Sequence, residues 1–219
     1  MGQSTISLDE LLKREWYLDT SLFADFLDSR APVAFREAQP HNGSTIMQLS
    51  PGSRPGVYSP VLVRGLRLQV RMTKNLHWLH MIACVAKIRF VYSELVRAEA
   101  IRRLRRSHAE ASRGELLDWW GLFSFFLKDY REVPLVFNDP GILSTLALAF
   151  PLSKNVQDYM HLVLAKERGA LFITQDKLNN QMERLRGEFY AGIVYWPEAK
   201  QVLLAHQELK GLLSEGESK

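Results

Sequence analysis

The sequence predicts a three-layer α/β/α fold with a central parallel sheet of about five strands, built as one domain. Short apolar runs that look like strands alternate with longer segments in which apolar residues recur at helical spacing. Parallel strands need a crossover, usually a helix, so this alternation favours a sheet covered by helices on both faces. The chain has 219 residues, 47% of them hydrophobic, which is enough to bury one core.

The first part of the chain is predicted to hold two additions to this plan. Residues 1–15 are expected to be an N-terminal helical extension, because Ser7 and Glu10 have the spacing of a capping box. Residues 28–60 are rich in Pro, Gly, Ser and Asn without a sustained period. We therefore expect an insertion or long loop over 28–65.

Periodicity and turn signals place the other elements. Strands are predicted at 16–18, 90–92, 134–137, 171–173 and 193–196. Helices are predicted at 8–14, 22–27, 66–87, 94–106, 115–130, 142–150, 156–168, 177–185 and 198–213. The aromatic block from Trp119 to Phe126 is predicted to lie in the core, with a dimer face as the alternative.

The charge distribution suggests an anionic partner. The net charge is only +4, but no acid occurs between Glu37 and Glu94. Five arginines then crowd one predicted helix, which are Arg97, Arg102, Arg103, Arg105 and Arg106. A charge run by itself usually marks a solvated helix face, whereas a phosphate backbone is the partner that such a cluster would serve.

Composition also excludes some kinds of site and indicates in which cellular compartment the protein is expected. The single cysteine, Cys84, rules out an intramolecular disulfide and a cysteine-rich zinc site. The apolar stretches are shorter than the roughly 20 residues of a membrane span, and no signal peptide is apparent. We therefore expect a cytoplasmic protein without a membrane segment.

Four acids stand where the chain enters or leaves the predicted strands. Asp19 ends the first strand and Asp176 the fourth, and each could simply cap the helix that follows. Asp158 could be an acid of a first helical turn, and Glu99 could pair with Arg103 four residues later. Each acid alone has such a structural explanation. Together they favour a common site at the carboxyl ends of parallel strands, where ligands bind in open sheets.

Four segments resemble, in order, the motifs of PIN domains. Residues 16–23 (WYLDTSLF) are similar to the opening strand with Asp-Thr-Ser, and 92–99 (YSELVRAE) to the motif in which a Ser begins a turn and a Glu follows. Residues 158–165 (DYMHLVLA) resemble Asp-x-x-His-x-x-x-Ala, and 172–176 (FITQD) resemble a strand ending in Thr-x-Asp. The region between the first and second acids, Asp19 and Glu99, is longer than in compact members.

The resemblance implies a metal-dependent endoribonuclease. Asp19, Glu99, Asp158 and Asp176 would be both catalytic residues and ligands of Mg²⁺ or Mn²⁺. The similarity is strongest to VapC-like toxins, which cut RNA and are held inactive by an antitoxin, so the expected partners are RNA, an antitoxin and a second copy in a homodimer.

Physical chemistry agrees with a cation, since carboxylates about 4 Å apart repel by about 4 kcal/mol at an effective dielectric of about 20. Oxygen ligands favour Mg²⁺ or Mn²⁺ over zinc. Substrate-binding and supporting roles are predicted for Thr20, Ser21, Thr174, Arg97, Arg102 and Arg103.

Three interpretations stay open at this point. His161 is predicted to pack in the core, with a hydrogen bond to the acids as the alternative. A phosphohydrolase with an Asp nucleophile is disfavoured, because Ser21 stands where that chemistry expects a second acid. A non-catalytic PIN-like module that binds RNA or protein is the main alternative function.

Overall fold

The computed structural model describes residues 6–29, 33–38, 58–63, 66–71, 73–139, 141–150, 156–176 and 180–205. Its centre is a sheet of five strands, all paired in parallel, in the order β6-β5-β1-β7-β8. The strands are β1 (Trp16–Leu18), β5 (Phe90–Ser93), β6 (Arg131–Val133), β7 (Leu171–Thr174) and β8 (Ile193–Tyr195). The predicted parallel sheet is confirmed.

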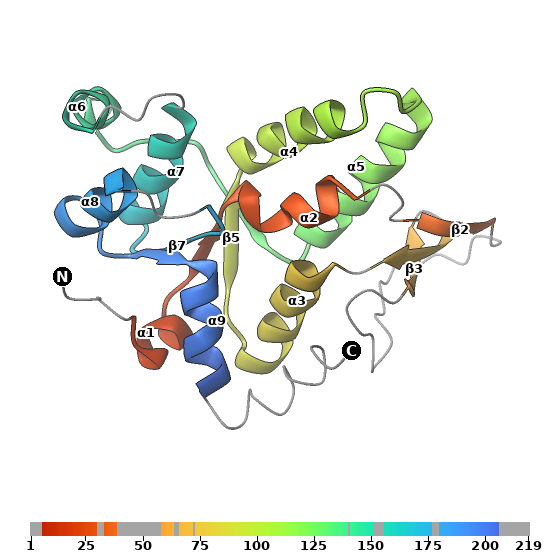
Figure 1. Cartoon of the computed structure of the whole chain (residues 1–219), viewed down its shortest axis with the longest axis horizontal. Coiled ribbons are helices and arrows are strands. Elements are labelled where there is room, and N and C mark those ends of the chain that lie inside the picture. Colours follow the sequence, from red (N-terminus) through yellow and green to blue (C-terminus); the bar gives the residue numbers. More distant parts are fainter. Residues whose placement is uncertain are drawn as a thin grey trace.

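Helices cover both faces of this sheet, which confirms the three-layer architecture (Figure 1). Alternate strand residues divide between two cores: Trp16 and Leu18 of β1 belong to one, and Tyr17 belongs to the other. The helices are α1 (Leu8–Lys13), the 3₁₀ helix η1 (Thr20–Phe23), α2 (Ala24–Leu27), α3 (Lys74–Ala86), α4 (Glu94–Ser107), α5 (Arg113–Leu127), α6 (Ile142–Ala149), α7 (Val156–Glu167), α8 (Asn180–Glu188) and α9 (Trp196–Ala205). The first core is formed with α1, η1, α2, α3, α4, α5 and α9, and the second with α6, α7, α8 and Leu95 of α4.

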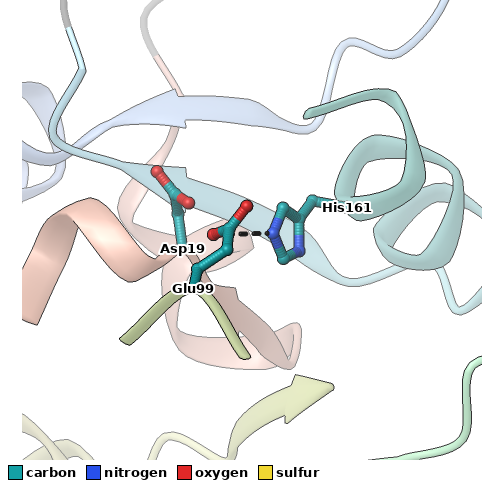
Figure 2. A group of neighbouring side chains, drawn as sticks. All are labelled: Asp19, Glu99 and His161. Atoms are coloured by element: carbon teal, nitrogen blue, oxygen red, sulfur yellow. Dashed lines mark hydrogen bonds and ion pairs between the residues drawn. The ribbon is translucent and has the colours of Figure 1, made fainter. Parts of the chain in front are cut away.

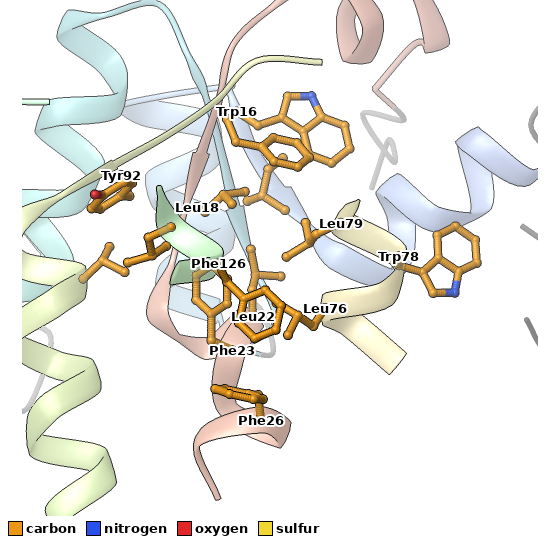
Figure 3. Packing of buried hydrophobic residues seen from close by; sticks show 14 of the residues in the cluster. Trp16, Leu18, Leu22, Phe23, Phe26, Leu76, Trp78, Leu79, Tyr92 and Phe126 are labelled. Carbon is orange, nitrogen blue, oxygen red and sulfur yellow. The ribbon is translucent and has the colours of Figure 1, made fainter. Parts of the chain in front are cut away.

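The first core is rich in aromatic side chains, several of which Figure 3 shows packed beside β1. Phe23 meets Phe123 edge to face, with ring centroids 5.3 Å apart, and Phe26 meets Trp119 in the same manner at 5.5 Å. Each such side chain contributes about 1.5–3 kcal/mol through burial. The predicted core role of the aromatic block on α5 is confirmed. Its ring contacts pack α5 against η1 and α2, the two helices that follow β1.

A second sheet was not predicted. Strands β2 (Val33–Ala38), β3 (Tyr58–Val63) and β4 (Leu66–Arg71) pair antiparallel in the order β2-β4-β3. Two of them lie within the segment expected to be an insertion or long loop. The helix predicted from residue 66 was wrong over 66–71, and α3 begins only at Lys74. Leu66, Leu68 and Val70 alternate, a period that fits a strand, whereas Leu68 and Met72 also have the spacing of a helix face.

Several other boundaries differ from the prediction. The third parallel strand is at 131–133, not 134–137, because Pro134 cannot donate to the ladder. Helix α8 begins at Asn180, and residues 177–179 lie outside the described part of the chain. Helix α9 begins at Trp196, and the predicted continuation over 206–213 also lies outside it. The capping box predicted for α1 is present.

No helix among the described residues has the length and apolar character needed to span a bilayer.

Candidate functional site

The four predicted acids meet in one small cavity at the carboxyl edge of the central sheet. The cavity has a volume of about 140 Å³. It is lined by Asp19, Thr20, Ser21, Glu99, Arg102, Arg103, Arg106, Asp158 and Asp176. The acids come from four segments that are far apart in the sequence: the end of β1, the middle of α4, the first turn of α7 and the loop after β7. The fold therefore brings together side chains that the sequence only places after strands or on helices.

Strand order explains why these ends meet. The chain runs outward from β1 through β5 to β6, and then returns to the other side of β1 as β7 and β8. Connections that leave two neighbouring strands in opposite directions open a crevice beyond their carboxyl ends. Here the neighbours are β1 and β7, and the backbone N–H of Asp19 donates to the carbonyl of Ile173 at 3.0 Å.

Asp19 does not cap the helix that follows it, since its side chain makes no capping hydrogen bond. Its carboxylate instead accepts hydrogen bonds from the hydroxyls of Ser21 (2.5 Å) and Thr174 (2.7 Å), both at Oδ2. The side chain is 8% exposed. A hydroxyl from η1 and one from the end of β7 thus hold this carboxylate, and the predicted supporting roles of Ser21 and Thr174 agree with these contacts.

Glu99 also departs from its simplest interpretation, an ion pair within α4. Its Oε2 accepts a hydrogen bond from the Thr20 hydroxyl (2.6 Å) and lies 3.2 Å from Nε2 of His161. Burial raises the pKa of Glu99, but the hydrogen bond and charge of His161, together with Thr20, outweigh it, so the pKa lies below its usual value. Arg103, the partner considered from the sequence, binds Asp28 through two hydrogen bonds of 2.9 and 2.6 Å.

Asp158 and Asp176 are held in surroundings that oppose their charge. Burial, followed by the charges of Asp19 and Glu99, raises the pKa of Asp158 to about 6. The pKa of Asp176 is also raised, first by burial and then by Asp19, although its side chain opens to solvent at the mouth of the cavity. Carboxylates in one small cavity repel one another, and a bound cation would relieve this repulsion.

His161 is buried in the core, as predicted, but it also belongs to the site. It is 1% exposed, and its Nδ1 lies 2.8 Å from the hydroxyl of Tyr17, which in turn lies 2.5 Å from Oγ of Ser93. Burial lowers the pKa of His161, but the hydrogen bond to Glu99 and the charges of the nearby acids raise it overall. Tyr17 is not predicted as part of the site, since nothing in its local sequence distinguishes it from a core residue, and Ser93 is expected only as the start of the turn in the second motif.

The arginines predicted to bind substrate divide into two groups. Arg102 and Arg103 line the cavity together with Arg106, which was not among the predicted site residues. Arg97 lies two residues before Glu99, about 200° away around a helix, and points elsewhere. Its guanidinium pairs with Glu132 at 3.1 Å and lies over the ring of Trp120.

The donor set fits a divalent cation. Asp19, Glu99 and His161 each offer one ligand atom, and these atoms all lie within 4.8 Å of one another (Figure 2). Asp158 and Asp176 add carboxylates around the same cavity. The repulsion that raises the pKa of Asp158 would be relieved by a bound cation.

A larger cavity, of about 430 Å³, lies at the opposite, amino end of the strands. Its walls are largely apolar, with Leu76, Phe90 and Phe126 among them. It holds none of the predicted site residues, and Glu15 at its edge is paired with Arg89 and Arg131. The volume of a cavity therefore does not single out the candidate site here, whereas the gathering of acids does.

Comparison of the sequence with protein-family models finds no match, and comparison with curated proteins finds none either. The PIN-domain resemblance therefore rests on the four motifs alone.

Proposed function

We propose that this protein is a divalent-metal-dependent endoribonuclease of the PIN-domain type that hydrolyses RNA phosphodiester bonds. The observation behind the proposal is that four acids from four separate segments line one cavity of about 140 Å³ at the carboxyl edge of a parallel sheet. Independent helix caps and helical ion pairs would have no reason to converge in this way. The order of the four motifs resembles that of PIN domains, and RNA is proposed as the substrate because of that resemblance.

Asp19, Glu99, Asp158 and Asp176 would hold the cation. A bound Mg²⁺ or Mn²⁺ would acidify a water molecule and stabilise negative charge on the leaving oxygen. Ser21 and Thr174 keep the Asp19 carboxylate in one orientation, and Thr20 does the same for Glu99. Hydroxyl donors that are fixed before substrate arrives need no rearrangement during the reaction.

The arginines of α4 supply the attraction for a polyanion. Arg102 and Arg106 are exposed beside the acids, and Arg103 is half-buried. A scissile phosphate drawn to this edge would lie between guanidinium groups on one side and carboxylates on the other. Acids alone would repel RNA, so this combination favours phosphodiester chemistry over simple cation storage.

The test is cleavage of a mixed pool of structured and single-stranded RNAs by purified protein with Mg²⁺, Mn²⁺ or EDTA. We expect cutting with a divalent cation, none with EDTA, and a rate at least about 100-fold lower for Asp19→Asn. Binding of RNA by Asp19→Asn should persist, because the arginines are unchanged. Asp9→Asn is the matched control, since Asp9 is an exposed acid on α1 that pairs with Lys13.

Two outcomes would overturn the proposal. Metal-dependent cutting that survives in Asp19→Asn would place the chemistry elsewhere. Salt-sensitive RNA binding without cutting under any condition would establish the non-catalytic PIN-like module instead.

The resemblance to VapC-like toxins extends the proposal to a cellular role. We infer that cleavage would arrest growth when the protein is produced without a cognate antitoxin. Growth after induction of the wild type and of Asp19→Asn measures this, and equal growth of both strains would contradict it.

A further inference from the structure

The ring of His161 is held in one orientation by its neighbours, and His161 has no role in the function proposed above. Its ring is stacked on Phe172 with an interplanar angle of 23° and centroids 6.4 Å apart. Its Nδ1 is hydrogen-bonded to the hydroxyl of Tyr17, which continues to Ser93. With the ring held on two sides, Nε2 can only face Glu99, as Figure 2 shows.

The atoms around Nε2 have the spacing of ligands of one ion. Nε2 lies 3.2 Å from Oε2 of Glu99, and an oxygen of Asp19 completes a set within 4.8 Å. Adjacent ligands of an octahedral ion with bonds of about 2.1 Å are about 3 Å apart. The Glu99–His161 separation can therefore be the edge of a coordination polyhedron as well as a hydrogen bond.

The hydrogen bond at Nδ1 favours coordination of a cation by Nε2 over a hydrogen bond from Nε2 to Glu99. Histidines that bind metals commonly donate their other ring N–H to a neighbouring acceptor, which fixes the tautomer and the ring orientation. If Nδ1–H donates to the oxygen of Tyr17 and Tyr17 donates to Ser93, the lone pair of Nε2 points at the two carboxylates.

We propose that Nε2 of His161 is a direct ligand of the catalytic cation together with Asp19 and Glu99, and that the site therefore prefers a first-row transition ion such as Mn²⁺ over Mg²⁺. Imidazole nitrogen suits transition ions, whereas Mg²⁺ favours oxygen ligands and bound water. The proposal rests on the cation site of the proposed function and does not depend on RNA being the substrate.

Electron spin-echo envelope modulation of the Mn²⁺-loaded wild-type protein tests this ligand directly. We expect coupling to a directly bound ¹⁴N nucleus, and loss of that coupling in His161→Gln. His108→Gln is the matched control, because His108 is a partly buried histidine bonded to the carbonyl of Leu27. Absence of ¹⁴N coupling in the wild type, or its persistence in His161→Gln, would overturn the assignment.

Metal affinities measured by titration separate a ligand from a residue that only orients Glu99. We expect Mn²⁺ to bind the wild type at least about tenfold more tightly than Mg²⁺, and His161→Gln to lose most of that preference. The glutamine side chain of this variant keeps an N–H donor for Glu99, so an unchanged Mn²⁺ affinity would show that hydrogen bonding is the whole role of His161. A protein that shows ¹⁴N coupling but cuts no RNA would retain this site and lose only the nuclease.

Discussion

Asp158 illustrates how the fold sets the chemistry of a single side chain. It lies in the first turn of α7, where a helix dipole favours an acid, yet burial and the charges of Asp19 and Glu99 raise its pKa to about 6. In the unfolded chain this carboxyl has its ordinary pKa of 3.8. Without a cation, ionised Asp158 therefore destabilises the folded state at neutral pH.

Replacing Asp158 with Asn should stabilise the metal-free protein. The raised pKa makes ionisation of Asp158 unfavourable in the folded state, and this penalty grows as the pH rises from about 4 to about 6 and is complete above that range. After allowance for solvent screening, we expect the free energy of unfolding at pH 7.5 to rise by about 1–2 kcal/mol. The gain should shrink as the pH falls through this window. Urea unfolding in EDTA measures it.

The control for that experiment is Asp139→Asn, at an exposed acid that does not line the cavity. Equal stabilisation by both variants, or a gain in Asp158→Asn that persists at pH 4, would contradict the role assigned to Asp158.

At single residues, the sequence could predict the acids better than their neighbours. Asp19 and Asp176 follow apolar strands, a position that favours ligand binding in any parallel sheet. Ser21 lies two residues after Asp19, and Thr174 lies two residues before Asp176, so both hydroxyls could be predicted from the same motifs. His161 is predicted mainly as a core residue, with a hydrogen bond to the acids as the alternative, because a helical pattern shows that a side chain is buried and does not show that its Nε2 meets a glutamate from another helix.

Helix α4 combines the two chemistries of the site on one face. Glu99, Arg102, Arg103 and Arg106 follow the spacing i, i+3, i+4 and i+7, so they share one side of the helix. Arg103 and Ser107 both bind Asp28 at the end of α2, which fixes the helix against the segment that follows β1. The helix can thus present an acid to a cation and arginines to phosphate without moving.

Replacing Arg102 and Arg106 together with Gln should weaken RNA binding and flatten its salt dependence. Each arginine that contacts a phosphate steepens the plot of log affinity against log salt concentration, so the slope should become less negative by about 1–2. Arg103 is left in place because it also holds Asp28. Fluorescence anisotropy at several salt concentrations with the Asp19→Asn background measures the slope.

The matched control is Arg105→Gln with Arg113→Gln, which removes the same charge at exposed positions outside the cavity. An equal change of slope in this control would show that RNA senses net charge and not the α4 face.

At the level of elements, predictions succeeded where burial is strong. Strands β1, β5, β7 and β8 are largely buried apolar runs and were placed within a residue or two. Strand β6 is an edge strand with two exposed residues, so its sequence carries little apolar signal. The helix predicted over strand β4 was wrong, because a short alternating run beside a helix can also contain apolar residues at helical spacing.

The order of the strands in the sheet is a property of the whole molecule and cannot be derived from single residues or elements. Alternating strands and helices predict a parallel sheet, but they do not tell which strands are neighbours. The observed order puts β1 beside β7, so Asp19 and Thr174 meet although they are far apart in the sequence. The crevice at this change of direction is where the acids gather.

That Asp19, Glu99, Asp158 and Asp176 share a divalent cation is tested most directly by thermal unfolding with and without Mn²⁺. A ligand that binds only the folded state at about 100 times its Kd stabilises it by about 2.7 kcal/mol, which corresponds to a rise in Tm of roughly 5–10 °C for a chain of this size. We expect that rise in the wild type and in Asp9→Asn, and its loss in Asp19→Asn. An unchanged Tm in the wild type, or an equal rise in Asp19→Asn, would contradict a shared cation site.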